Sequence, residues 1–238
     1  MKFKFILKAT ALLVLLASFT GTANAEGRFA IGVSVGVGNF DTSGTETEGG
    51  NIGAADTSVM TANESQAAAL GNIFVEYAAQ FGNFGATLGI STIPGTHSLG
   101  KRVREDISNP VADLQDTGDY TAKASVSDHV GYYLEPTYYF PGTESGIYLK
   151  LGALRTTVTT EESLNYGINS STYGNDTVWG SQVGIGLRSR HSSGFFTKFE
   201  YSESDYDALK FTSTTGNLNS IAADIDAQMF TVGLGWSF

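Results

Sequence analysis

The last eleven residues of this 238-residue chain, Gln228 to Phe238, constrain its fold more than any other stretch. Apolar side chains take every second position and small or polar ones fill the gaps, so a strand here has one apolar face. That face begins and ends in an aromatic residue: Phe230, Val232, Leu234, Trp236 and Phe238. A membrane-spanning β-strand needs this pattern over about 9–11 residues, with rings at both water interfaces.

The opposite end of the chain predicts export. Three lysines within the first eight residues precede an uncharged run from Ala9 to Phe19, and the segment ends Ala23-Asn24-Ala25. This is the pattern of a secretory signal peptide. The run is too short for an anchor helix, which needs about 20 apolar residues. We therefore expect residues 1–25 to be a signal peptide cleaved after Ala25, and residues 26–238 to form one domain.

Composition excludes several classes of function. Three of the 14 basic residues lie in the signal segment, whereas all 24 acidic residues lie beyond it. Such an acidic chain repels nucleic-acid phosphates. The absence of cysteine excludes disulfides and thiolate metal sites. We expect no nucleic-acid partner, no cofactor and no metal. No later stretch approaches 18 apolar residues, so a mature chain that crosses a membrane does so with strands.

Seven further stretches alternate as the terminal one does, which makes eight strands. Eight is an even number, as single-chain bacterial barrels require. Pro136 interrupts one of these stretches, and because it cannot donate a ladder hydrogen bond we expect a bulge there. The seven stretches are 29–37, 73–81, 84–92, 132–140, 147 to about 154, 179–189 and 195–202.

The connections alternate in length. Short turns are expected at Gly82-Asn83, Pro141–Gly146 and Ser192–Gly194, and long polar loops at 39–70, 94–128 and 161–177. Tight periplasmic turns and long outer loops are the asymmetry of outer-membrane barrels. Aromatic residues then align at both ends of most strands, which a soluble sandwich or a lipocalin-like barrel has no reason to do. They are Phe29, Phe81, Phe84, Phe140, Phe195 and Phe238 at the periplasmic level, and Tyr132, Trp179, Tyr201 and Phe230 at the other.

A terminal alternating strand that stops on Phe238 resembles the insertion signal of bacterial outer-membrane β-barrels. The whole chain resembles the eight-stranded family that includes opacity-type proteins and the membrane domain of OmpA-like proteins. This resemblance implies an all-β fold, a transmembrane, antiparallel, up-and-down barrel of eight strands with long outer loops. It implies a bacterial outer-membrane location and contact with outer-membrane lipids, lipopolysaccharide and the barrel insertion machinery. It also implies a non-enzymatic, monomeric protein with a structural or surface-interaction role, whose loops meet an unknown extracellular ligand.

The small-residue faces of the strands carry six charges, three acids and three bases: Glu76, Glu135, Lys150, Arg188, Lys198 and Glu200. An eight-stranded barrel is only wide enough for side chains to fill, and buried charges must be paired. Glycines on the same faces leave room for these long side chains. We therefore expect a closed ion-pair network in which Glu200 bridges Arg188 and Lys198. The alternative, a narrow porin-like channel for small solutes, needs this network to rearrange.

Two other groups of residues suggest chemistry. Lys101, Arg102 and Arg104 could hold lipopolysaccharide phosphates, or form a solvated loop cluster. Ser127 and His129 share a strand face near the outer lipid surface, where a His-Ser-acid set resembles that of barrel enzymes that modify lipid A. That resemblance makes an enzyme the second alternative. The three histidines of the chain lack the spacing of metal ligands.

Overall fold

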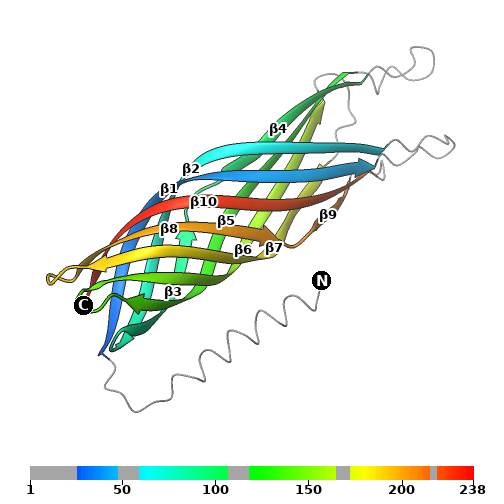
Figure 1. Cartoon of the computed structure of the whole chain (residues 1–238). Coiled ribbons are helices and arrows are strands. Elements are labelled where there is room, and N and C mark those ends of the chain that lie inside the picture. The colour runs from blue at the N-terminus through cyan, green and yellow to red at the C-terminus, as the bar shows by residue number, and fades with distance from the viewer. Residues whose placement is uncertain (1–25, 48–58, 107–117, 165–171, 215–218) are drawn as a thin grey trace, which may run out of the picture.

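Ten β-strands make up the described part of the computed structural model, residues 26–47, 59–106, 118–164, 172–214 and 219–238 (Figure 1). No helix in these ranges is long and apolar enough to cross a membrane. The strands are β1 (Glu26–Thr47), β2 (Val59–Phe81), β3 (Phe84–Ile93), β4 (His97–Asp106), β5 (Gly118–Tyr139), β6 (Ser145–Leu164), β7 (Thr172–Arg190), β8 (Phe195–Tyr206), β9 (Leu209–Thr212) and β10 (Ser220–Ser237).

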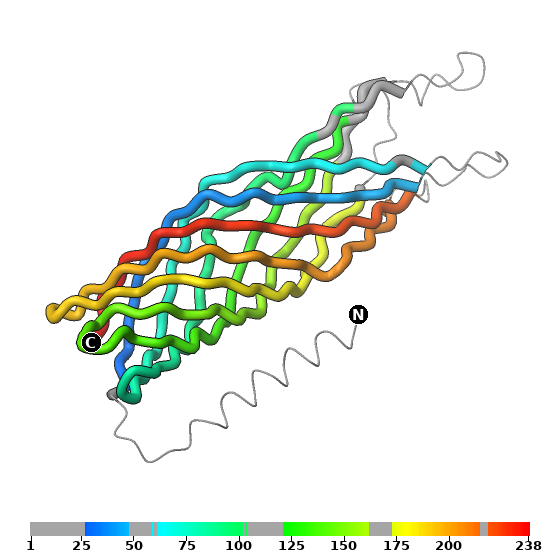
Figure 2. The backbone as a smooth tube through the Cα atoms, viewed as in Figure 1, coloured from blue at the N-terminus to red at the C-terminus, as the bar shows by residue number. Residues whose placement is uncertain are grey.

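Eight of these strands close into one antiparallel ring (Figure 2). The order β1-β2-β3-β5-β6-β7-β8-β10 returns from β10 to β1, while β4 pairs with β5 and β9 pairs with β10. At the base, the Phe238 N–H donates to the Phe29 carbonyl at 2.9 Å. The eight-stranded antiparallel barrel that the sequence predicts is confirmed, and the C-terminal strand closes it.

The three short turns lie where they are predicted. Phe81 ends β2 and Phe84 begins β3, with Gly82 at a φ of 61° between them. Gly142 and Gly194 take positive φ values in the other two turns. Only glycine adopts such values without steric cost, which explains why each tight turn contains one.

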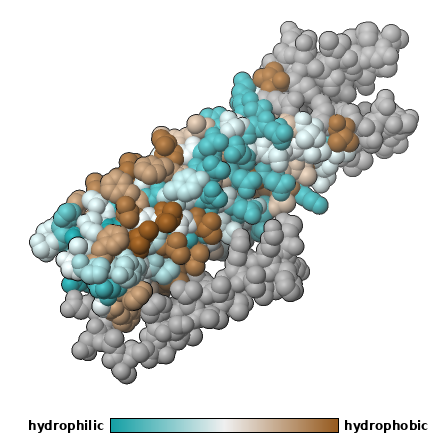
Figure 3. All heavy atoms as spheres, viewed as in Figure 1, coloured by the Kyte–Doolittle hydropathy of each residue, from teal (hydrophilic) through white to brown (hydrophobic). Residues whose placement is uncertain are grey.

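Exposed apolar side chains form a band at the end of the barrel that carries these turns and the C terminus, on the strands of the ring. Figure 3 shows one face of this band. The alternate residues of β1 from Phe29 to Val37 are each more than half exposed, and Phe230, Leu234 and Trp236 of the terminal strand are about half exposed. A continuous apolar surface of this kind faces lipid in an outer-membrane barrel. Farther along the barrel, the described atoms on the face that Figure 3 shows are mainly hydrophilic.

The strands continue beyond this band, and the apolar side chains there change sides. On β10, Phe230 is half exposed, whereas Ile225 and Ala227 are buried inside. The same inversion separates outward Val37 from inward Phe40 on β1. Where water replaces lipid outside the barrel, the apolar face turns to the interior.

The long loops predicted from the sequence are therefore wrong over the described residues. The described parts of 39–70, 94–128 and 161–177 are mostly strand, because β1, β2 and β5 to β7 extend well past the band and β4 is an additional strand. In the outer half, the inward-facing apolar residues alternate with polar residues on the outer surface, so these stretches were interpreted as polar loops. The bulge predicted at Pro136 is also wrong: Pro136 pairs with Ala86 of β3 in an unbroken register. Proline does interrupt the ladder on the other side, because the β5–β6 pairing skips Glu135 and Pro136 without a register shift. The β5–β6 register shifts instead between Ser127 and Val130, where Asp128 has a φ of 51°.

Candidate functional site

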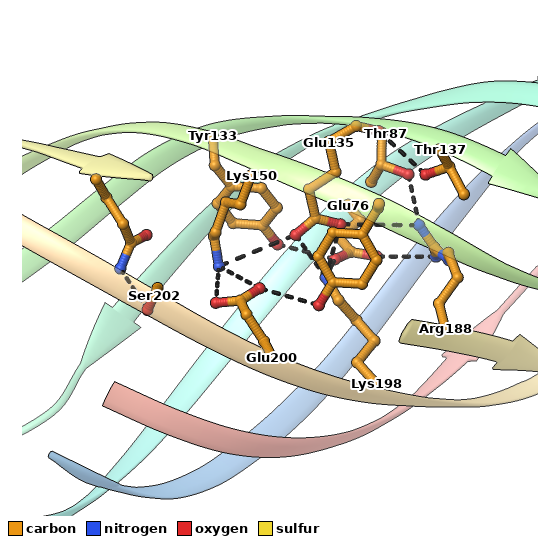
Figure 4. Close-up of polar contacts among 12 residues, drawn as sticks. Glu76, Thr87, Tyr133, Glu135, Thr137, Lys150, Arg188, Lys198, Glu200 and Ser202 are labelled. Carbon is orange, nitrogen blue, oxygen red and sulfur yellow. Dashed lines mark hydrogen bonds and ion pairs between the residues drawn. The ribbon is translucent and has the colours of Figure 1, made fainter. Parts of the chain in front are cut away.

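Six charged side chains meet inside the membrane-spanning half of the barrel (Figure 4). Each occupies a strand position whose side chain points into the barrel, and each is at most 8% exposed. They come from five strands: Glu76 from β2, Glu135 from β5, Lys150 from β6, Arg188 from β7, and Lys198 and Glu200 from β8. We call this set the lumen cluster.

Lys198 and Arg188 form the first half of the lumen cluster. The Lys198 ammonium donates to Glu76 Oε1 at 2.6 Å and to the two carboxylate oxygens of Glu135 at 2.7 and 2.8 Å. The Arg188 guanidinium lies 3.4 Å from Glu76 Oε2 and 3.8 Å from Glu135 Oε2, and it donates to Thr87 Oγ1 at 2.6 Å. Two bases and two acids are therefore paired across the lumen.

Lys150 and Glu200 form the second half. The Lys150 ammonium donates to both oxygens of Glu200, at 2.8 and 3.0 Å, and lies 3.9 Å from Glu135. The Tyr148 hydroxyl also donates to Glu200, at 3.0 Å. Glu135 thus joins the two halves, and every member of the lumen cluster has an oppositely charged partner. Such pairing is what a buried charge requires.

The bridge predicted for Glu200 is wrong. Arg188 and Lys198 are cross-strand neighbours, as the count from the turn predicts, but both reach across the lumen to Glu76 and Glu135. Glu200 instead pairs in register with Gly186 of β7. The Tyr148 ring of β6 lies over that glycine, and its hydroxyl donates to Glu200, which also accepts from Lys150 on β6.

Aromatic rings, which were not predicted from the sequence, complete the cluster. The Tyr133 hydroxyl donates to Glu76 Oε1 at 3.0 Å, and the Lys150 ammonium lies 4.4 Å from the centre of the Tyr133 ring. Rings occupy much of the space that the inner glycines were expected to leave for charged side chains. A pattern in the sequence could have predicted them, because each ring lies over the glycine opposite it on the neighbouring strand. The pairs are Phe74 over Gly32, Tyr133 over Gly89, Tyr148 over Gly186, and Phe196 over Gly235.

Ser127 and His129 do not face lipid. Both line a cavity of about 70 Å³ inside the barrel, which Lys150, Lys198 and Glu200 of the lumen cluster also line. The two residues themselves lie farther out than Tyr132, where the exposed apolar band of β5 ends. His129 Nε2 lies 3.0 Å from the buried Tyr206 hydroxyl. Burial, and secondarily the nearby His97, lowers the pKa of His129 to about 4. The lipid-facing catalytic set that the sequence suggested is therefore not assembled by these two residues.

Among the remaining predicted residues, those with described side chains lie on the outer surface. Lys101 is exposed on β4, in a strand and not in the predicted loop, and the side chains of Arg102 and Arg104 lie outside the described residues. The proposed insertion residues, four on β10 and Phe238 directly after it, alternate with inward-facing residues and point outward. Phe238 is the most exposed of them, at 75%.

One protein family and several solved structures are similar to this chain. The family model described as outer membrane protein beta-barrel domain matches residues 9–238. No curated protein sequence matches the chain. Similar solved structures include the outer membrane protein OprG of Pseudomonas aeruginosa, at 14% identity over 91% of this chain and 98% of that one, with a TM-score of 0.47. Ail, the attachment invasion locus protein of Yersinia pestis, is 14% identical over 88% of this chain and 99% of its own, with a TM-score of 0.40. The outer membrane protease OmpT of Escherichia coli is 8% identical over 89% of this chain and 97% of its own, with a TM-score of 0.42.

Proposed function

Because the chain belongs to the outer membrane protein beta-barrel domain family, we propose that it is a closed barrel that acts through its outer half at the bacterial cell surface. The observation that carries the proposal is the lumen cluster. Six charged side chains, each at most 8% exposed, occupy the interior at the level of the apolar band. A solute or ion that crossed the barrel there would have to separate buried ion pairs.

The outer half is the part left free to interact. Strands β1, β2, β5 and β10 continue beyond the band and carry polar side chains into the external medium. In proteins with a rigid scaffold, the residues that bind partners usually lie on the segments at one end of that scaffold. We propose an extracellular ligand for this half, and lipopolysaccharide phosphate as the contact of Lys101, Arg102 and Arg104.

Export and assembly complete the proposal. We propose cleavage after Ala25, recognition of Phe230 to Phe238 by the barrel insertion machinery, and a monomer in the membrane. The monomer is supported by the closed ring, since β10 pairs with β1 along its length and leaves no strand edge in the band.

Epitope tags inserted into the chain in whole cells test this orientation. A tag after Gly50, in the segment between β1 and β2, is expected to bind antibody on intact cells. A tag after Gly142, in the short turn between β5 and β6, is expected to bind only after the outer membrane is permeabilised. Staining of both tags on intact cells, or of the Gly142 tag alone, would refute the proposed function.

Flux measurements test whether the lumen is closed. Vesicles that contain the refolded protein are expected not to swell in arabinose, whereas vesicles with a general porin swell. Swelling at the porin's rate would favour the channel alternative.

A further inference from the structure

His129 lies where β5 changes its partner strand, just outside the apolar band. Strand β5 pairs with β3 as far as His129 and with β4 from Val126 outward. The bulge between these two positions, with Asp128 at a φ of 51°, turns the His129 ring into the barrel. There its Nε2 lies 3.0 Å from the Tyr206 hydroxyl, so this contact connects β5 to β8 through the interior.

Strand β4 is weakly held at this point. Among the described residues it pairs with β5 along one edge, while its other edge approaches β2 at Glu64 and Gly100 without pairing. Inside the barrel, Leu99 of β4 is 2% exposed and lines the same cavity as His97 and His129. Strands with few ladder hydrogen bonds are the first to open in local unfolding. A change that displaces His129 therefore acts first on β4.

A proton on His129 has nothing to compensate its charge. The Nδ1 atom is buried and has no hydrogen-bond partner among the described residues, and Glu200 is already held by Lys150 and Tyr148. The exposed Asp128 accepts from Ser127 and forms no ion pair with the ring within the described part of the chain. Facing the cavity from the other strands are His97, Lys150, Lys198 and Glu200, and the hydroxyls of Tyr133, Tyr148 and Tyr206.

Burial, and then the nearby His97, oppose this proton and lower the pKa of His129 to about 4. A solvated imidazole has a pKa of about 6.5. A state in which the ring has left the cavity therefore binds the proton first as pH falls, and acid favours that state over the closed one.

We propose that the outer half contains an acid-triggered switch, in which protonated His129 leaves the cavity, its contact with Tyr206 breaks, and β4 separates from the wall. Release of β4 uncovers Leu99 and the apolar cluster that includes Leu154 and Val158. The outer half then presents at acid pH an apolar surface that it hides at neutral pH. This inference does not depend on the function proposed above, because it concerns the folded barrel alone.

Single cysteines report the opening, because the chain contains none of its own. The reagent is 4,4′-dithiodipyridine, which reacts with thiols at acid and neutral pH, added to the refolded protein in detergent micelles. We expect Leu99→Cys to react roughly a hundredfold faster at pH 4 than at pH 7, relative to the exposed Ala222→Cys, as a change in pKa from 6.5 to about 4 implies. Ala30→Cys, buried in the membrane-spanning half, should stay unreactive. A mobility shift on heating confirms that each variant is folded.

Histidine variants of the Leu99→Cys protein identify the trigger. His129→Gln keeps a hydrogen-bonding side chain that does not titrate, so the cysteine should stay protected at pH 4. His97→Gln removes the neighbouring charge and should move the opening to lower pH. The matched control is His191→Gln, at an exposed histidine beside a short turn, which should leave the acid opening unchanged.

Tyr206→Phe tests the contact without a change in charge, and it should raise the reactivity of Leu99→Cys at pH 7 by roughly two- to tenfold. Equal relative reactivity of Leu99→Cys at pH 7 and pH 4 would overturn the proposal, as would acid opening that persists in His129→Gln. Reaction of Ala30→Cys together with Leu99→Cys would also overturn it, because it would show global unfolding and not the release of one strand.

Discussion

Lys198 and Glu76 lie 122 positions apart in the sequence, yet the Lys198 ammonium donates to Glu76 Oε1 at 2.6 Å inside the barrel. The same ammonium holds Glu135 at 2.7 Å, so one base from β8 fixes two acids from β2 and β5. This arrangement determines where the barrel is most sensitive to substitution.

Replacing Lys198 by methionine leaves Glu76 and Glu135 with too little positive charge in a buried site. Removing one partner of a buried ion pair costs about 3–5 kcal/mol of unfolding free energy. Urea unfolding of the refolded protein, followed by tryptophan fluorescence, measures the loss. Lys210→Met is the control, because Lys210 is exposed on β9 and its replacement should change stability by about 0.5 kcal/mol or less. Equal midpoints for the two variants would contradict the account.

The two halves of the lumen cluster should differ in sensitivity. Among the described residues, Glu135 lies within 4 Å of three bases, whereas Glu200 forms an ion pair with Lys150 only. We therefore expect Glu135→Gln to destabilise the barrel by about 3–5 kcal/mol and Glu200→Gln by about 1–3 kcal/mol. Thermal or urea unfolding of both variants ranks them. A larger loss for Glu200→Gln would restore Glu200 as the central bridge and reject the observed pairing.

A methyl group at Gly89 should displace the Tyr133 ring. An added Cβ would overlap that ring, whose hydroxyl holds Glu76. Gly89→Ala is expected to cost about 1–3 kcal/mol of unfolding free energy, as overpacking does. Gly71→Ala on β2 meets no atom within 4 Å, so it should be neutral or stabilise by about 0.5–1 kcal/mol. Equal stability of both alanine variants would show that the ring does not rest on Gly89.

Acid should destabilise the barrel partly through His129. Because burial lowers the pKa of this ring to about 4, the unfolded chain binds the proton first as pH falls. The stability from the neutral ring is complete above pH 6.5, is lost as pH falls from 6.5 to about 4, and amounts to roughly 3 kcal/mol. Unfolding of the wild type and of His129→Gln between pH 7 and pH 4 isolates this contribution. A constant difference in stability between the two proteins over this range would contradict it.

The lipid-facing half of the fold could be predicted because lipid imposes one rule on every strand. Phe230 to Phe238 and Phe29 to Val37 alternate without exception, and the glycine turns mark their ends. The outer half was missed because its apolar residues have the opposite parity. Val37 and Phe40, or Ala227 and Phe230, are three positions apart, an odd spacing that changes the side of the strand. If the same alternating positions are assumed to be apolar along the whole strand, the outer half resembles a polar loop.

The members of the lumen cluster could be predicted, but not their pairing. Parity shows that Glu76, Lys150 and Glu200 point inward, because each strand alternates independently of the others. Which base meets which acid depends on the reach of side chains across the lumen and on the rings that lie over the glycines. The space over Gly186, for example, is filled by the Tyr148 ring, whose hydroxyl donates to Glu200 beside Lys150.

Single-channel conductance of the refolded wild-type protein in a planar bilayer tests the central claim, a lumen closed by ion pairs. The account predicts a folded barrel without discrete openings. Steady, discrete openings of the wild type that become larger with Lys198→Ala or Glu200→Ala would contradict it, because they would show that the lumen cluster lines a conducting path.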